Sequence, residues 1–361
     1  MSGLSQQVEV MAVMGACAPE RGRFARDLAL RRESVLLPAE RIAEDASAVE
    51  SALGLLGIVH PAPELVIEYP LATGATDVIG SLTQRDDEAE GQTARLRELF
   101  CVVDASHLLD DLFRADYVVL EADQRWTARG DLSYVCRAEI IVKQIEYAST
   151  VVLVNWSQLA REELLMLTAL VAHLSPRADV QCAGETPGSV AESWAHGDVP
   201  AAGYTGEETR AGWMCVLNGD FDPGREHDRV SAVRYEQLRP FHPGRLKDLL
   251  DQRVEAEEFG RVARSAGFAR LATRSHITAQ WDHVGQVISL TPATDDDDTG
   301  ATDELLAIGQ ELAFIGVDLD PIGLTAALDA AAVTDAELHA GPTLWQEFAD
   351  PFPGWESVSE N

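Results

Sequence analysis

The chain has 361 residues, 46% of them hydrophobic, and a formal net charge of −32 at pH 7. This length favours two domains over a single core, and the hydrophobic content without an apolar run of eighteen residues predicts a soluble globular protein. The excess of acidic residues argues against a nucleic-acid-binding protein, because phosphate contacts require Lys and Arg.

The N-terminal residues predict a buried strand, a turn and a helix. Val8–Met14 is apolar and strand-like, and Phe24–Leu30 begins a helix on the far side of a turn at Gly15–Arg23. Nucleotide-binding proteins place a phosphate loop at such a junction. No positively charged and apolar leader precedes the strand, so a cytoplasmic location is expected.

The turn lacks most of the residues that would hold a phosphate. Such a loop needs several glycines, a Lys for the β- and γ-phosphates, and a Ser or Thr for Mg²⁺. Gly15 keeps the first glycine, but Gly22 offers no hydroxyl and Glu20 puts a carboxylate where a phosphate would sit. Arg21 can attract an anion, although its fork-shaped guanidinium is a poor substitute for Lys. We therefore expect a degenerate nucleotide site and no cofactor.

The rest of the first half alternates apolar runs with amphipathic stretches. We expect strands at Leu65–Glu68, Leu99–Val103, Val151–Val154 and Ala178–Cys182, and helices at Ser47–Gly57, Tyr134–Tyr147 and Ala160–Leu174. Alternating strands and helices are typical of an α/β domain, in which helices cover both faces of a parallel sheet. This domain is expected to span residues 1–183.

Residues 184–211 are rich in Gly, Pro, Ala and acidic residues, which indicates a linker or a loop. A smaller α+β domain is expected at 212–340. Its predicted strands are Gly212–Leu217, Val230–Leu238, Phe268–Ala272, Gln286–Thr291 and Glu311–Ile315, and its predicted helices are Pro243–Asp251 and Pro321–Ala332. An acidic aromatic tail follows at 341–361.

The metal-binding and nucleophilic residue types form no recognisable site. The five cysteines are scattered, without a C-x-x-C spacing, which argues against a disulfide framework and a zinc knuckle. Cys17 lies at the predicted helix start, a position that can lower the pKa of a thiol. His242 precedes a proline, and a capping or packing role is the ordinary interpretation. The run Asp295–Asp298 lacks the spacing of a calcium loop, so no metal site is predicted.

Charge is unevenly distributed along the chain. Residues 275–361 contain seventeen Asp and Glu and no Lys or Arg. This stretch either forms a solvated face, which is the commoner case, or favours a basic protein partner. The cluster Arg21–Arg32 is the only plausible basic patch for direct RNA contact, which is otherwise not expected.

Four aromatic residues recur every three to four positions near the C-terminus. They are Trp345, Phe348, Phe352 and Trp355, and they alternate with acidic residues. Their ordinary role would be to hold the tail against the smaller domain. As exposed side chains they would instead form an anchor set for a protein partner.

Several longer blocks resemble the CobW family of metal-associated GTPases. FCVVDASHLLDDL at Phe100–Leu112 and QIEYASTVVLV at Gln144–Val154 are similar to blocks of its GTPase domain. RPFHPGRL at Arg239–Leu246, GFARLATR at Gly267–Arg274 and the closing GPTLW and DPFP blocks resemble its C-terminal half, in the zinc-regulated branch. The resemblance implies a P-loop-NTPase-like parallel sheet and a CobW C-terminal domain.

The family's functional motifs are largely absent at the matching positions. Its GxxGxGKTT loop falls on Gly15–Arg23, where only Gly15 matches. Its NKxD guanine motif falls on residues 155–158: Asn155 matches, but Gln158 replaces the acidic residue that accepts two hydrogen bonds from guanine. The cysteine metal motif CxCC has no counterpart in residues 42–66, and only Glu68 fits a nearby acidic position. The resemblance thus implies a member without GTPase activity, cofactor or the usual metal site.

The resemblance also implies a role. Zinc-regulated members are made when zinc is scarce, and an actinobacterial relative recruits a ribosome hibernation factor to the ribosome. We therefore expect a non-catalytic, cytoplasmic recruitment protein with a basic partner, either a ribosomal protein or the hibernation factor. Arg239 and His242 join the tail aromatics as candidate contact residues. The alternative is a zinc metallochaperone GTPase with atypical nucleotide motifs.

Overall fold

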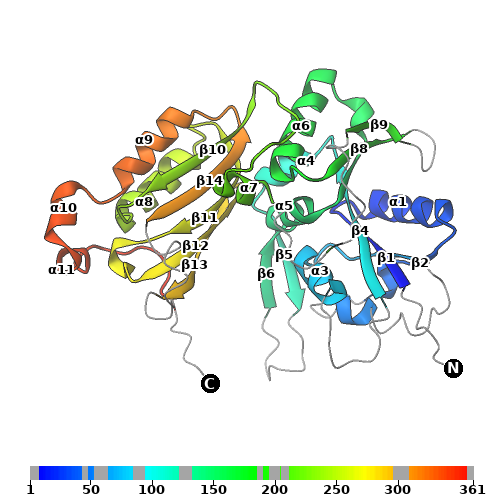
Figure 1. The fold of residues 1–361 in the computed structure, drawn as a ribbon, viewed down its shortest axis with the longest axis horizontal. Coiled ribbons are helices and arrows are strands. Elements are labelled where there is room, and N and C mark those ends of the chain that lie inside the picture. Colours follow the sequence, from blue (N-terminus) through cyan, green and yellow to red (C-terminus); the bar gives the residue numbers. More distant parts are fainter. Residues whose placement is uncertain are drawn as a thin grey trace. The chain divides into compact units, whose positions relative to one another are not determined.

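The computed structural model describes residues 8–42, 48–52, 64–83, 94–121, 132–184, 190–194, 204, 211–295 and 309–355. The chain divides into two compact units. The first comprises Met1–Gly212 and Asp222–Arg225, and the second comprises Trp213–Phe221 and Glu226–Asn361. Each unit has its own sheet (Figure 1).

The first unit is built on a seven-stranded sheet. Across the sheet, the strands are β2 (Val35–Leu37), β3 (Glu64–Glu68), β1 (Val8–Met14), β4 (Ala94–Asp104), β7 (Thr150–Val154), β8 (Asp179–Ala183) and β9 (Val190–Trp194). All neighbours are parallel except β9, which runs antiparallel to β8. The last five residues of β1 are fully buried, as expected for a central strand covered on both faces.

Helices lie on both faces of this sheet. They are α1 (Ala18–Arg31), α3 (Ala75–Thr83), α4 (Leu108–Phe113), α5 (Arg137–Tyr147) and α6 (Arg161–Leu174). The chain moves one way across the sheet from β1 to β3 and the other way from β4 to β7 and β8. Because crossovers are right-handed, α1 covers one face, and α5 and α6 cover the other (Figure 1). The predicted α/β class is confirmed.

A separate two-stranded hairpin, β5 (Tyr117–Glu121) and β6 (Leu132–Cys136), precedes α5. The predicted helix Tyr134–Tyr147 is therefore wrong in its first turn, because α5 begins only at Arg137. The segment Leu132–Cys136 contains Tyr and Val, which favour a strand.

The second unit holds a five-stranded antiparallel sheet. In order, its strands are β10 (Val230–Gln237), β14 (Gln310–Val317), β11 (Arg261–Ala269), β12 (Ile277–Val284) and β13 (Val287–Asp295). Its helices are α7 (Gly212–Asn218), α8 (Pro243–Leu249), α9 (Pro321–Ala331), α10 (Asp335–Ala340) and α11 (Pro342–Trp345), and a π-helical turn, Leu250–Val254, extends α8. Aromatic side chains fill the core, with Trp281 next to Phe241 and Phe314. The predicted α+β class is confirmed.

Two predictions for the second unit are corrected, and one strand was not predicted. Gly212–Leu217 forms helix α7 rather than a strand, since a short apolar run fits either structure. The strand predicted at Phe268–Ala272 ends at Ala269 and begins earlier. Strand β12 was missed, although Gln280 and Asp282 alternate with the buried Ala279, Trp281 and His283 as on a half-buried strand.

Other predictions reach beyond the described residues. The helix predicted at Ser47–Gly57 and the linker at 184–211 lie mostly outside them. The Asp295–Asp298 run begins at the last residue of β13, and its remainder is not described. Among the described helices, none has the length and apolar character needed to cross a bilayer.

Candidate functional site

The turn after β1 is much shorter than the sequence predicts. Helix α1 begins at Ala18 rather than near Phe24, so only Gly15, Ala16 and Cys17 connect it to the strand. Pro in the first turn and the acidic Glu20 favour this early start, because both suit a helix N-terminus. Three residues cannot surround a phosphate as the longer glycine-rich loops do.

Arg21 is used inside the protein rather than for anion binding. Its Nε donates to Glu68 Oε1 at 3.0 Å and its Nη1 donates to the Gly15 carbonyl at 2.6 Å. The Arg21 and Glu68 side chains are 5% and 8% exposed. A phosphate at this position would have to compete with the Glu68 carboxylate. The junction that would carry a phosphate loop therefore holds a buried ion pair.

Gly15 in the turn and Gly22 in the first part of α1 both lie close to neighbouring atoms. Gly15 has a φ of +141°, and a Cβ there would lie 2.2 Å from the Val102 carbonyl oxygen. A Cβ on Gly22 would lie 3.3 Å from Glu68 Oε1. Gly15 thus lets the turn approach β4, and Gly22 leaves room for the carboxylate that pairs with Arg21.

The residues at the guanine-motif position hold strand ends together. Asn155 adopts a φ of +57°, and its Nδ2 donates to Asp104 Oδ2 at 2.7 Å. Trp156 Nε1 donates to the Ala183 carbonyl at 2.7 Å. Gln158 is exposed at the end of this turn. The Asn155 side-chain amide, which a guanine-reading site requires, is therefore engaged with another strand end.

Cys17 does not become a reactive thiolate. It lies at the N-cap of α1, but burial and the nearby carboxylates of Asp104 and Asp111 raise its pKa to about 11. The lowering that a helix N-terminus can produce is therefore not found for the pKa of Cys17. Cys101 is fully buried and its pKa is raised to about 12, chiefly by burial. In the described part of the chain, no three His, Cys, Asp or Glu side chains converge on a possible metal position.

A cleft of about 640 Å³ lies beside α1, against strands β4, β7 and β8. Asn155 and Trp156 line one end of it, and Glu98 and Asp179 line the other. The cleft thus extends beyond the region lined by the residues that match nucleotide motifs.

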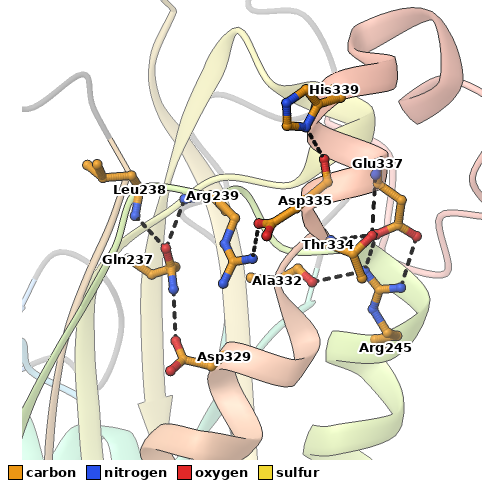
Figure 2. Close-up of polar contacts among 10 residues, drawn as sticks. All are labelled: Gln237, Leu238, Arg239, Arg245, Asp329, Ala332, Thr334, Asp335, Glu337 and His339. Atoms are coloured by element: carbon orange, nitrogen blue, oxygen red, sulfur yellow. Dashed lines mark hydrogen bonds and ion pairs between the residues drawn. The ribbon is translucent and has the colours of Figure 1, made fainter.

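In the second unit, Arg239 and His242 have partners within the unit. Arg239 Nη1 donates to Asp335 Oδ1 at 3.1 Å (Figure 2). His242 Nδ1 accepts from the Arg245 backbone N–H at 3.3 Å, which makes His242 the N-cap of α8. Its ring stacks on Phe348 with 4.3 Å between centroids, and burial and Arg245 lower its pKa.

Arg245 connects α8 to the start of α10. Its two terminal nitrogens donate to Glu337, at 3.0 and 2.7 Å, and Nη2 also donates to the Ala332 carbonyl (Figure 2). Glu337 and Thr334 form a capping box at the start of α10. These bonds lower the pKa of Glu337 to about 2, with the Arg245 hydrogen bond as the main cause.

Arginines from residues 229–274 pair with the acidic stretch at 275–361. The pairs are Arg229–Asp318, Arg234–Glu311, Arg239–Asp335, Arg245–Glu337, Arg264–Asp282 and Arg274–Asp350. This compensation was not predicted from the sequence. The signal was present, because the acidic stretch directly follows an arginine-rich one.

The tail aromatics contact the second unit itself. Trp345 is 8% exposed and Phe352 packs against the core. Trp355 Nε1 donates to the Leu290 carbonyl at 2.9 Å, and the Arg274 guanidinium lies 4.3 Å from the Trp355 ring centroid. This arrangement favours the structural interpretation of the tail over a free anchor set.

Comparisons with known proteins agree with this architecture. Residues 230–332, which make up much of the second unit, match the model of the cobalamin synthesis protein cobW C-terminal domain. Over 347 residues the chain is 22% identical to "Zinc-regulated GTPase metalloprotein activator 1" of Dictyostelium discoideum, covering 91% of this chain and 69% of that protein.

Two solved structures are also similar. The Zn(II)-bound YjiA GTPase from E. coli is 16% identical with a TM-score of 0.34, covering 91% of this chain and 99% of that one. A Zn(II)-bound triple mutant of YjiA is 14% identical with a TM-score of 0.36 and the same coverage.

Proposed function

We propose that this chain is a CobW-family protein that no longer binds GTP and acts as a non-catalytic recruitment protein. One observation carries the proposal: the buried Arg21–Glu68 ion pair occupies the junction where a phosphate loop would be. A three-residue turn and a guanine-motif Asn bonded to Asp104 support it.

The proposed setting is the cytoplasmic response to zinc starvation, in which the protein brings a ribosome hibernation factor to the ribosome. Similarity to a zinc-regulated protein supports the link to zinc. The net charge of −32 favours a basic partner, either a ribosomal protein or the hibernation factor. Six of the seventeen acidic residues at 275–361 pair with arginines of the second unit, so part of the charge of this stretch is compensated internally.

The first experiment measures binding of a fluorescent GTP analogue with Mg²⁺. We expect no saturable binding up to about 100 μM, a concentration far above a nanomolar-to-micromolar site, while the YjiA GTPase serves as a positive control. Micromolar binding with turnover would instead support the second candidate, a zinc metallochaperone GTPase. That candidate is favoured by the printed name of the Dictyostelium relative.

The second experiment tests recruitment. Ribosomes from zinc-limited and zinc-replete cells are sedimented with the purified protein, with and without the hibernation factor. We expect the protein to co-sediment with ribosomes from zinc-limited cells and to increase the amount of bound hibernation factor. The absence of co-sedimentation under both conditions would contradict the ribosomal role.

A further inference from the structure

The cleft beside α1 is elongated. It follows α1 from Glu20 to Arg31, about 16 Å at roughly 1.5 Å per helical residue. It also follows β7 from Thr150, at its start, to Asn155, just beyond its end. Nucleotides in such folds occupy only the region outside the carboxyl ends of the strands. The cleft therefore extends well past the degenerate nucleotide motifs.

The topology of the first unit explains why this space exists. Parallel sheets are covered by helices on both faces, yet α5 and α6 lie opposite α1. Within the described residues of this unit, no helix returns to the α1 side after β8. On β8, Asp179, Gln181 and Ala183 line the cleft and are half-buried, whereas the alternate residues are buried. Among the described residues, one helix-wide position beside α1 is thus left without a covering helix.

The walls of the cleft are amphipathic. Apolar contact surface comes from Phe24, Phe100, Val152, Val154 and Trp156. The rings of Phe24 and Phe100 lie 5.3 Å apart, and the Trp156 indole is fixed by its bond to Ala183. A ligand in this cleft would therefore rest on a preorganised apolar floor.

The α1 wall carries charges of alternating sign. Glu20, Arg23, Asp27 and Arg31 follow one another at spacings of three and four residues, and all four line the cleft. Residues at these spacings lie on one face of a helix. A second helix beside α1 presents its own charges at the same spacing, so four opposite charges on it can pair along the full length.

We propose that this cleft docks one amphipathic helix from a protein partner. Its apolar stripe would contact the floor, and its flank would place basic residues opposite Glu20 and Asp27 and acidic residues opposite Arg23 and Arg31. This inference rests on the proposed role as a binding protein and adds the surface and the kind of partner. The complementarity of four alternating charges selects a helix over a compact ligand.

The test uses stapled 14-residue helical peptides that carry a leucine stripe and, on one flank, Lys and Glu at the spacing of the α1 charges. Two peptides with opposite orders of Lys and Glu are made, one for a helix parallel to α1 and one for an antiparallel helix. Fluorescence anisotropy is expected to show micromolar binding of one peptide and none of a peptide with Ser in the stripe. Ala183→Arg fills the cleft and is expected to weaken binding at least tenfold. The control Ala326→Arg, at an exposed position of α9, is expected to change it less than twofold.

Arg23→Glu provides an independent check, because Arg23 is exposed and its replacement leaves the core intact. This substitution is expected to weaken binding of the peptide that carries Glu at the position facing residue 23 at least fivefold. A peptide with Lys at the same position is expected to restore binding. Failure of both peptides, or equal binding by Ala183→Arg, would overturn the proposal. A wild-type dimer that dissociates in Ala183→Arg would assign the cleft to a second copy and also overturn it. If the peptides fail to bind but the wild-type protein still co-sediments with ribosomes, only the docking proposal is overturned. If the wild-type protein does not co-sediment with ribosomes, the proposed recruitment role is contradicted as well.

Discussion

The stability of the second unit is expected to fall at mildly acidic pH because of one buried histidine. His283 is 5% exposed and belongs to a chain of hydrogen bonds in the core. Trp281 Nε1 donates to Ser265 Oγ at 2.8 Å, and Ser265 Oγ lies 2.9 Å from His283 Nδ1. His283 Nε2 lies 2.9 Å from the Gly285 carbonyl and donates to it. Every donor and acceptor in this hydrogen-bonded series, from Trp281 to Gly285, has a partner only when the imidazole is neutral.

Burial is the main reason that the pKa of His283 is lowered from 6.5 to about 4. The Arg264 guanidinium also lowers it, whereas the Gly285 carbonyl and the Asp282 carboxylate raise it. Between these two values the unfolded chain binds a proton that the folded chain excludes. The contribution of His283 is therefore fully present above about pH 6.5 and is lost as the pH falls toward 4. From pH 7.5 to pH 5 this loss amounts to about 2 kcal/mol.

The assay compares urea unfolding of the full chain at pH 7.5 and pH 5 for the wild type and His283→Asn. The variant is less stable at pH 7.5, but it has no titrating group at this position. Its free energy of unfolding is expected to fall by about 2 kcal/mol less than that of the wild type between the two pH values. His276→Asn, at an exposed position, is the control for loss of a histidine. Equal pH dependence in the wild type and His283→Asn would refute the reasoning.

Three further predictions concern the first unit. Glu68→Gln leaves the Arg21 charge buried without its partner, so we expect the free energy of unfolding in urea to fall by about 3–5 kcal/mol. A decrease below about 1 kcal/mol would contradict the buried ion pair. Gly15→Ala places a Cβ 2.2 Å from the Val102 carbonyl oxygen at a positive φ. We expect the free energy of unfolding to fall by at least about 2 kcal/mol in urea. An unchanged free energy of unfolding would show that the turn can move away from β4. Cys17 has a pKa of about 11, compared with the ordinary thiol value of 9.0. Its alkylation by iodoacetamide at pH 8, followed by mass spectrometry, is therefore expected to be at least tenfold slower than that of a free thiol. An equal rate would contradict the raised pKa.

The sequence by itself determined the elements whose patterns are local. Val8–Met14 contains the continuous apolar run Val10–Met14 and forms β1 with the predicted bounds. Helix α6, predicted from Ala160 and found from Arg161, has a long periodic pattern and lies next to a predicted strand. Burial of such segments depends mainly on the residues within them, so their type and approximate extent can be inferred without knowing the rest of the fold.

The early start of α1 was harder to foresee. The sequence from Gly15 to Arg23 contains the residues of a turn as well as those of a helix start, and the family pattern favoured a long loop there. The helix is stabilised by contacts that Arg21 makes with Glu68, which lies 47 residues away. A local pattern could not choose between the two structures, because the deciding interaction is not local.

The same reason applies to charge in the second unit. Sequence counts identified an acidic stretch without Lys or Arg, but the pairs Arg239–Asp335 and Arg245–Glu337 join residues 96 and 92 positions apart. Only the antiparallel sheet and the placement of α10 bring them within hydrogen-bonding distance. Composition therefore determined the net charge of the chain and the classes of partner that it disfavours. The tertiary structure decided which charges are compensated, because electrostatic pairing depends on distance in space rather than along the chain.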